Sequence, residues 1–164
     1  MRLRTALETI DRALWSNAYV HIKPLKTEAE LLYAVCECQL ADAQKDLVNP
    51  AWFSIGRAYL FKEDNCPCLI YNEREEPVGF LNLCKWLGAG EAYSWSFYID
   101  KNHQGRGYGR NAAQVAIRIL KTAAPSTPIK LATEKDNENA HRLYLSLGFN
   151  RLSEMDGDDI VFGL

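Results

Sequence analysis

The sequence lacks the features that would assign it to a specialised class of protein. It has no run of about 18 apolar residues, the length that a membrane-spanning helix needs. Its formal net charge is −2, from 19 basic and 21 acidic side chains, so it carries no excess of positive charge to attract nucleic acid. It also lacks internal repeats and low-complexity segments. These absences leave an ordinary globular composition, and 164 residues suit a single domain with a substantial core.

The five cysteines do not form the pattern of a secreted or metal-binding protein. Their number is odd and no export signal precedes them, which predicts reduced thiols and a cytoplasmic location. Cys36 and Cys38 fall on a predicted helix, where residues two apart point to different sides. Structural zinc sites typically separate their cysteines by about two to four residues. We therefore expect no metal site.

The first 18 residues predict a short amphipathic helix. Leu3, Leu7, Ile10 and Leu14 recur at helical spacing, and Glu8 interrupts what would otherwise resemble the apolar centre of a signal peptide. We interpret residues 1–18 as an N-terminal helical extension and residues 19–164 as one domain. The extension could cover an edge of the sheet or a partner subunit, as in a homodimer, and the sequence leaves both open.

Residues 95–110, WSFYIDKNHQGRGYGR, predict a strand, a glycine-rich loop and the start of a helix. Glycine lets the backbone approach a ligand closely, and the first turn of a helix has N–H groups free to bind an anion such as phosphate. Arg106 and Arg110 add positive charge. The pattern is neither a Walker loop nor the dinucleotide fingerprint, because its glycines follow GxGxG spacing.

A second pattern lies downstream, in NENAHRLYLSLGF at residues 137–149. Ala140, Leu143, Tyr144 and Leu147 share one face of a predicted helix. Gly148 then has the position of a residue that ends a helix in a left-handed conformation.

Together the two patterns resemble the GNAT family of acetyl-CoA-dependent N-acetyltransferases. Gln104, Gly107 and Gly109 match the Gln-x-x-Gly-x-Gly of its pyrophosphate-binding loop, and residues 137–149 match its other diagnostic stretch, in the same order. The resemblance implies an α/β fold of the α+β type, with a mixed, mostly antiparallel sheet that splays between the fourth and fifth strands and is flanked by helices.

The local patterns fit that fold. Thr27 and Glu30 form a predicted capping box at the start of a helix. The expected helices cover residues 28–45, 50–61, 111–121 and 137–147. The expected strands cover residues 18–25, 68–72, 77–86, 92–100 and 129–133, followed by a hairpin of residues 151–154 and 159–164.

The resemblance also implies roles for individual residues. Backbone N–H groups of the loop would bind the coenzyme's pyrophosphate, and an N–H of the fourth strand would polarise the thioester carbonyl. Tyr144 matches the general acid, with packing as the alternative, and Asn137 would contact the pantetheine arm or cap its helix. His103 and His141 could each touch a phosphate or carry a proton, but we expect both to be exposed polar residues. The loop residues are Gln104, Gly105, Arg106, Gly107, Tyr108, Gly109 and Arg110, and the strand residues are Phe97, Tyr98 and Ile99.

The general base and the acceptor are less well defined. Related polyamine acetyltransferases often carry an acid where this chain has Trp95, so Glu91 and Glu134 are the substitutes we expect. The family members that this sequence most resembles are bacterial spermine/spermidine acetyltransferases, and a polyamine needs carboxylates and aromatic walls. Other amines stay open, including an antibiotic, an amino acid or a protein N-terminus, as does a non-catalytic acyl-CoA-binding module. The expected partner is thus a small-molecule amine, with neither nucleic acid nor a membrane. The candidate residues of a polyamine site are Glu37, Asp42, Asp46, Glu91, Trp52, Phe53 and Trp95.

Overall fold

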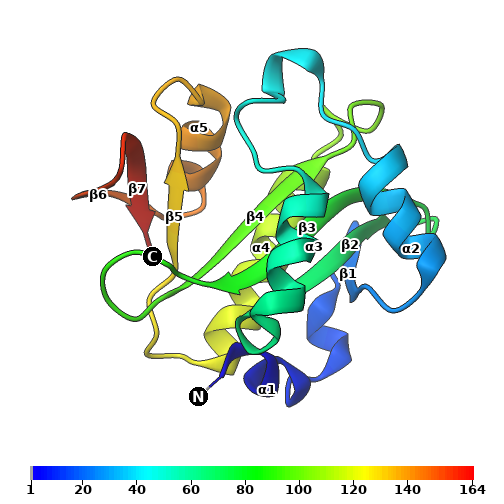
Figure 1. Cartoon of the computed structure of the whole chain (residues 1–164), viewed down its shortest axis with the longest axis horizontal. Helices are drawn as coiled ribbons and strands as arrows, with labels where there is room; N and C mark the ends of the chain where they lie inside the picture. The colour runs from blue at the N-terminus through cyan, green and yellow to red at the C-terminus, as the bar shows by residue number, and fades with distance from the viewer. Residues whose placement is uncertain (1) are drawn as a thin grey trace.

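Two antiparallel sheets lie edge to edge in the computed structural model, which describes residues 2–164 (Figure 1). The first has the order β1-β2-β3-β4 and the second the order β5-β7-β6. One parallel bridge, between Tyr93 and Ile129, joins them. This arrangement confirms the predicted α+β fold with a splayed antiparallel sheet. The strands are β1 Val20–Pro24, β2 Asn65–Asn72, β3 Pro77–Lys85, β4 Tyr93–Ile99, β5 Lys130–Thr133, β6 Asn150–Asp156 and β7 Asp159–Gly163.

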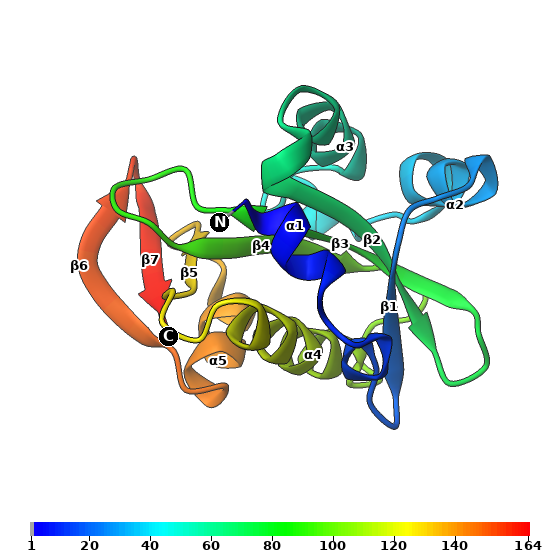
Figure 2. The ribbon, with the colours of Figure 1, turned by 90° about the horizontal axis from the view of Figure 1, so that it is seen from below.

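Helices cover both faces of the first sheet (Figure 2). On one side lie α2 (Glu28–Leu32) and α3 (Ala51–Leu60), and on the other lies α4 (Tyr108–Ala123). Small residues of α4, including Ala112, Ala113 and Ala116, are fully buried, which lets the helix approach the sheet closely. The last helix, α5 (Glu138–Ser146), packs its predicted apolar face against the second sheet, where Tyr144 contacts Phe162 of β7.

Several local predictions are confirmed. Thr27 accepts a hydrogen bond from the Glu30 N–H while Glu30 reaches back, completing the capping box of α2. Gly148 has φ of 91°, and the Phe149 N–H donates to the Tyr144 carbonyl behind it, as expected of a helix C-terminus.

β2 begins at Asn65, before the predicted residue 68, because residues 65–68 continue the ladder with β3.

The predicted helix over residues 28–45 is wrong in its second half. α2 has five residues and passes into a π-helical turn, Tyr33–Glu37, after which Cys38 has an extended conformation. The chain leaves the helix because its backbone finds partners elsewhere: the Gln39 N–H donates to the Asp100 carboxylate and the Gln39 carbonyl accepts from the Lys101 N–H. Cys36 and Cys38 therefore do not share a helix; Cys36 is exposed and Cys38 is buried.

The N-terminal segment folds as two short helices, and its leucines enter the main core. They are α1 (Leu3–Glu8) and a 3-10 helix, η1 (Arg12–Trp15), whose first turn is capped by Asp11. Leu3 and Leu7 are buried in the same hydrophobic cluster as the inner face of α4. Across residues 2–164, no helix is long and apolar enough to cross a membrane.

We expect Leu7→Ala to lower the free energy of unfolding by about 2–5 kcal/mol, because it leaves a cavity in this core. Urea denaturation followed by circular dichroism measures the loss. Glu8→Ala, at an exposed position of the same helix, is the control and should change stability by no more than about 0.5 kcal/mol. Equal stabilities of the two variants would show that α1 packs only loosely on the domain.

Candidate active site

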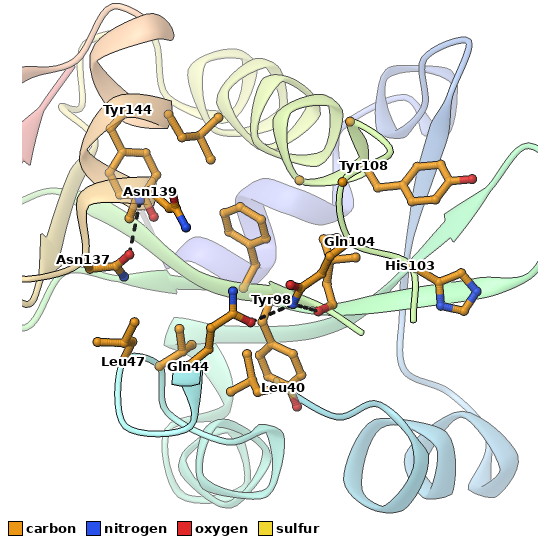
Figure 3. A pocket seen from close by; sticks show the side chains of 18 residues that line it. Leu40, Gln44, Leu47, Tyr98, His103, Gln104, Tyr108, Asn137, Asn139 and Tyr144 are labelled. Carbon is orange, nitrogen blue, oxygen red and sulfur yellow. Dashed lines mark hydrogen bonds between the residues drawn. The ribbon is translucent and has the colours of Figure 1, made fainter. Parts of the chain in front are cut away.

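A cavity of about 270 Å³, here called the loop cavity, lies between the glycine-rich loop, β4 and α5 (Figure 3). Segments distant in the sequence meet around it. Its lining residues are Leu40, Gln44, Leu47, Val48, Phe97, Tyr98, Ile99, His103, Gln104, Gly105, Gly107, Tyr108, Gly109, Asn137, Asn139, Ala140, Leu143 and Tyr144.

The loop ends at an uncapped helix N-terminus. Gly105 and Gly107 have φ of 76° and 82°, a left-handed conformation that strains any residue with a Cβ. Gly107 is the residue before α4, and no side chain of residues 2–164 caps that helix. The N–H groups of its first turn therefore lack the partners that a cap would provide, and they carry the positive end of the helix dipole. The arrangement is suited to bind an anion at the wall of the cavity.

Asp100, at the end of β4, holds the loop in place. Its carboxylate accepts hydrogen bonds from the N–H groups of Gln39 (2.9 Å) and Asn102 (3.0 Å), and His103 Nδ1 lies 3.2 Å from it. Burial alone would raise the pKa of Asp100, but these hydrogen bonds outweigh it and hold the pKa below its usual value. His103, which was expected to be an exposed polar residue, is thus partly buried and belongs to the hydrogen-bond network of the loop.

Gln104 ties the loop to β4 and to the segment before α3. Its Nε2 donates to the Ile99 carbonyl at 3.0 Å and to Gln44 Oε1 at 2.7 Å (Figure 3). The sequence predicted only a backbone role for this residue. The contact with Gln44 joins residues 60 positions apart, so no local pattern could have indicated it.

Where β4 parts from β5, the backbone N–H groups on that side of β4 have no backbone partner within residues 2–164. The Tyr93 N–H donates to the Pro128 carbonyl across the gap, whereas the Asp100 N–H donates to Val78 of the opposite neighbour, β3. Because N–H directions alternate along a strand, the N–H groups of Phe97 and Ile99 face the gap and that of Tyr98 faces β3. Of the three residues predicted to polarise a carbonyl, Phe97 and Ile99 therefore have the suitable backbone direction, and Tyr98 contributes its side chain to the cavity.

Tyr144 lies across the cavity from β4, on α5. Its ring packs among Trp95, Phe149 and Phe162, with centroid separations of 6.4, 5.7 and 5.9 Å. Burial raises the pKa of Tyr144 to about 12. The nearby Trp95 indole lowers it slightly, but Trp95 Nε1 does not meet hydrogen-bond geometry and has no partner among the residues described. The phenol therefore remains protonated at neutral pH and is available as a donor.

A second cavity of about 310 Å³, the central cavity, continues from the loop cavity into the gap between the sheets. The two share Phe97, Asn137 and Tyr144 among their lining residues. Three carboxylates line the central cavity: Asp46, Glu134 and Asp159. Burial raises the pKa of Asp159, and the neighbouring Asp156 and Asp158 raise it further. Sequence analysis missed Asp159, because a hairpin residue has no motif that marks it.

The remaining predicted cofactor and base residues are placed differently. Asn137 caps α5 through its Oδ1, which accepts from the Ala140 N–H, and it also lines both cavities. Arg106 and Arg110 are exposed beside the loop, donating to the Asn102 carbonyl and to Ser146 Oγ. Glu91 is exposed on the segment before β4, outside both cavities.

The residues predicted for a polyamine site are brought together only in part: Trp95 lines the central cavity with Asp46, and Phe53 and Trp95 line a further cavity. Asp46 lines the central cavity, whereas Glu37 and Asp42 line neither cavity, and Asp42 forms an ion pair with Lys45 at 2.5 Å. The Trp52 side chain is exposed. In the described part of the chain, no cluster of histidine, cysteine and acidic side chains could hold a metal ion.

The fold is that of an acyltransferase. The sequence profile of the acetyltransferase (GNAT) family matches residues 31–149, and the chain belongs to that family. The family uses acyl-CoA, and the glycine-rich loop and uncapped helix of this chain fit its phosphates.

Three solved structures illustrate the similarity of fold. RimJ from Mycobacterium smegmatis, in complex with CoA-disulfide, is 19% identical with a TM-score of 0.68, covering 88% of this chain and 81% of that one. SpeG from Vibrio cholerae, a spermidine/spermine N-acetyltransferase, is 14% identical with a TM-score of 0.64, covering 91% and 92%. An acetyltransferase from Agrobacterium tumefaciens is 14% identical with a TM-score of 0.63, covering 91% and 92%. A comparison with curated proteins finds no match.

We expect Gly107→Ala to weaken coenzyme A binding by about tenfold or more, which corresponds to about 1.4 kcal/mol. A Cβ disfavours the left-handed φ of 82°, so the loop would relax and move its N–H groups. Calorimetric titration with coenzyme A measures the affinity. Gly157→Ala is a matched control, because Gly157 has φ of 59° in the remote β6–β7 turn with no atom near its Cβ position. Equal affinities for the two variants would contradict the assignment of the loop.

Proposed function

We propose that this protein transfers the acetyl group of acetyl-CoA to a primary amine of a small molecule, by direct attack of the amine on the thioester. The observation that carries the proposal is the meeting, in one connected pair of cavities, of an uncapped helix N-terminus, unpaired β4 N–H groups and the Tyr144 phenol. The helix N-terminus suits the pyrophosphate of the coenzyme. The β4 N–H groups suit the thioester carbonyl, and the phenol suits the departing sulfur.

Polarisation of the thioester carbonyl is assigned to the Phe97 N–H. It faces the gap between the sheets, and Phe97 lines both cavities. A backbone donor placed where negative charge develops on the carbonyl oxygen contributes about 3–4 kcal/mol to lowering the barrier. The Ile99 N–H has the same direction but lies nearer the loop, where the Ile99 carbonyl already accepts from Gln104.

Tyr144 is assigned as the donor to the leaving thiolate. Its pKa of about 12 lies above the value of about 8.5 for a free thiol, so complete proton transfer to the sulfur would be uphill. A hydrogen bond to the developing negative charge therefore describes its role better than full protonation. The product thiol takes its proton from solvent, or it receives the proton that the amine loses on forming the amide.

The base is assigned to a carboxylate of the central cavity, with Asp159 preferred to Glu134. An alkylamine arrives protonated, with a pKa of about 10.4. A carboxylate whose pKa is raised accepts that proton more readily than one with an ordinary pKa. Asp159 has that raised pKa, and Glu134 is exposed to solvent. Glu91, the other candidate from the sequence, lies outside both cavities.

A non-catalytic acyl-CoA-binding module is the alternative. Such a module would need the loop and the helix N-terminus, but it would need neither a phenol nor carboxylates in the central cavity. This chain has both the phenol and the carboxylates there. Calorimetry with acetyl-CoA, followed by measurement of thiol release with a panel of amines, separates the two. Tight binding without turnover of any amine would favour the module.

We expect Tyr144→Phe to lower kcat by roughly 10–100-fold while leaving coenzyme affinity nearly unchanged, because only the hydroxyl that faces the sulfur is lost. Thiol release under saturating acetyl-CoA measures kcat. Tyr93→Phe, on buried β4 outside both cavities, is the control and should retain normal rates. A Tyr144→Phe enzyme with normal kcat would make the phenol a packing residue.

We expect Asp159→Asn to lose most of its turnover and Asp158→Asn to retain it with an altered pH profile. A base must be ionised, so activity falls as the pH drops through its pKa. Asp158 raises the pKa of Asp159, and its removal should move this acid limb to lower pH. The acid limb of the pH profile of kcat/KM tests both variants. An unchanged profile in both variants would point to Glu134, and Glu134→Gln is the next test.

A further inference from the structure

The face of the first sheet that lies beneath α2 and α3 has an apolar part and a polar part. Towards α2 it carries the apolar cluster of Leu69, Phe80 and Tyr98. Under α3 it carries buried polar side chains instead, which are costly to bury unless they have partners. They line a third cavity of about 600 Å³, here called the α3 cavity. Its four buried polar residues are Ser54, Asn65, Asn82 and Ser94, each at most 8% exposed.

A chain of hydrogen bonds fixes the orientation of two of these amides. Asn65 Nδ2 donates to the Phe61 carbonyl at 3.0 Å, and a carbonyl can only accept. Asn65 Oδ1 is therefore the atom that accepts from Asn82 Nδ2, at 3.0 Å. Asn82 Oδ1 is left over, and it has no hydrogen-bond partner in residues 2–164. Asn82 lines the α3 cavity, and its 3%-exposed side chain thus places a buried, unpaired hydrogen-bond acceptor beside that cavity.

The charges that line the α3 cavity sum to zero. Arg57 and Lys85 are positive, Asp64 and Asp156 are negative, and none of the four pairs with another residue of the described chain. The Arg57 guanidinium lies over the Phe61 ring at 5.1 Å from its centroid. Because these four charges cancel, the α3 cavity by itself has no net attraction for a polycation, unlike the central cavity with its three carboxylates.

The α3 cavity adjoins the proposed reaction centre. It shares Asn49, Trp95 and Ser96 with the central cavity, which contains Tyr144 and Asp159. Along β4, Ser94 and Phe97 are three residues apart, or about 10 Å. A molecule of that length could place its amine beside the thioester whose carbonyl is assigned to the Phe97 N–H, with its remainder over Asn82 and Ser94.

We propose that the α3 cavity binds the acceptor, and that it selects a primary amine bearing uncharged hydroxyl or amide groups over a polyamine. Such groups both donate and accept, so they can satisfy Asn82 Oδ1 and the serine hydroxyls together. A polyamine would bring further ammonium groups, each with a pKa near 10.4, into a cavity of zero net charge beside Arg57 and Lys85. This inference rests on the proposed acetyl transfer and adds the class of acceptor to it.

Three amines test the selectivity: glucosamine for hydroxyls, alanyl-alaninamide for amides and spermidine for a polyamine. Their binding to the enzyme saturated with coenzyme A is followed by tryptophan emission, because Trp86 and Trp95 line the α3 cavity. Acetylation is followed by thiol release. We expect kcat/KM for glucosamine or for the dipeptide amide to exceed that for spermidine by about tenfold or more. The better of these two acceptors shows whether the cavity recognises hydroxyl or amide groups.

The outcomes separate this inference from the function beneath it. Two outcomes would overturn the proposed selectivity of the α3 cavity while coenzyme A still binds normally. Either spermidine would be the preferred acceptor, or none of the amines would alter the tryptophan emission. Failure to bind coenzyme A would overturn the proposed acetyl transfer itself.

Asn82→Ala tests the residue, with Asn72→Ala as its matched control. Both are buried asparagines of β2–β3, but Asn72 makes its hydrogen bonds within the β2–β3 turn, remote from the cavity. We expect Asn82→Ala to raise KM for the preferred amine by about tenfold, with KM for acetyl-CoA unchanged, and Asn72→Ala to change neither. Ser54→Ala, which removes a single hydroxyl, should raise KM for the same amine if Asn82→Ala does not fold. Unaltered KM for the amine in both cavity variants would contradict the assignment.

Discussion

The separation of β4 from β5 is the constraint on which the site depends. The sheets are joined by the bridge at Tyr93 and then diverge, so the odd-numbered N–H groups of β4 face a gap. Unpaired backbone groups are costly when they are buried, and proteins rarely retain them without a purpose. Here they border two cavities, where a bound carbonyl could replace the missing strand. The gap that weakens the sheet is therefore also the place where we propose that the reaction occurs.

Aromatic rings from both sheets and from α5 pack together beside the gap. Trp95 of β4 packs edge-on against Phe149, with ring centroids 5.7 Å apart, and Tyr144 contacts both rings. Tyr144 also contacts Phe162 of the second sheet. The phenol is thus positioned by rings from both sides of the gap, and its orientation does not depend on a flexible loop. This explains why a residue with a proposed chemical role is also part of the hydrophobic core.

The two faces of the first sheet differ in character, and the difference assigns them different roles. The α4 face is apolar and joins the main core, including Leu3 and Leu7 of α1. The α3 face is apolar only near Phe80 and becomes polar at Asn82 and Ser94. Alternation along each strand produces this separation, because neighbouring residues point to opposite faces. The coenzyme is assigned to the end of β4 where α4 begins, and the acceptor to the polar half of the opposite face.

The sequence alone determined whatever depends on neighbouring residues. The capping box of Thr27, the end of α5 at Gly148 and the strand–loop–helix around Gly107 are local interactions, and each was predicted correctly. Only the tertiary structure decided where α2 ends, which residues complete the cavities and which amide oxygen stays free. Gln39 meets Asp100 across 61 residues and Asn65 meets Asn82 across 17. Such contacts exist only after the strands have paired, so no pattern along the chain records them.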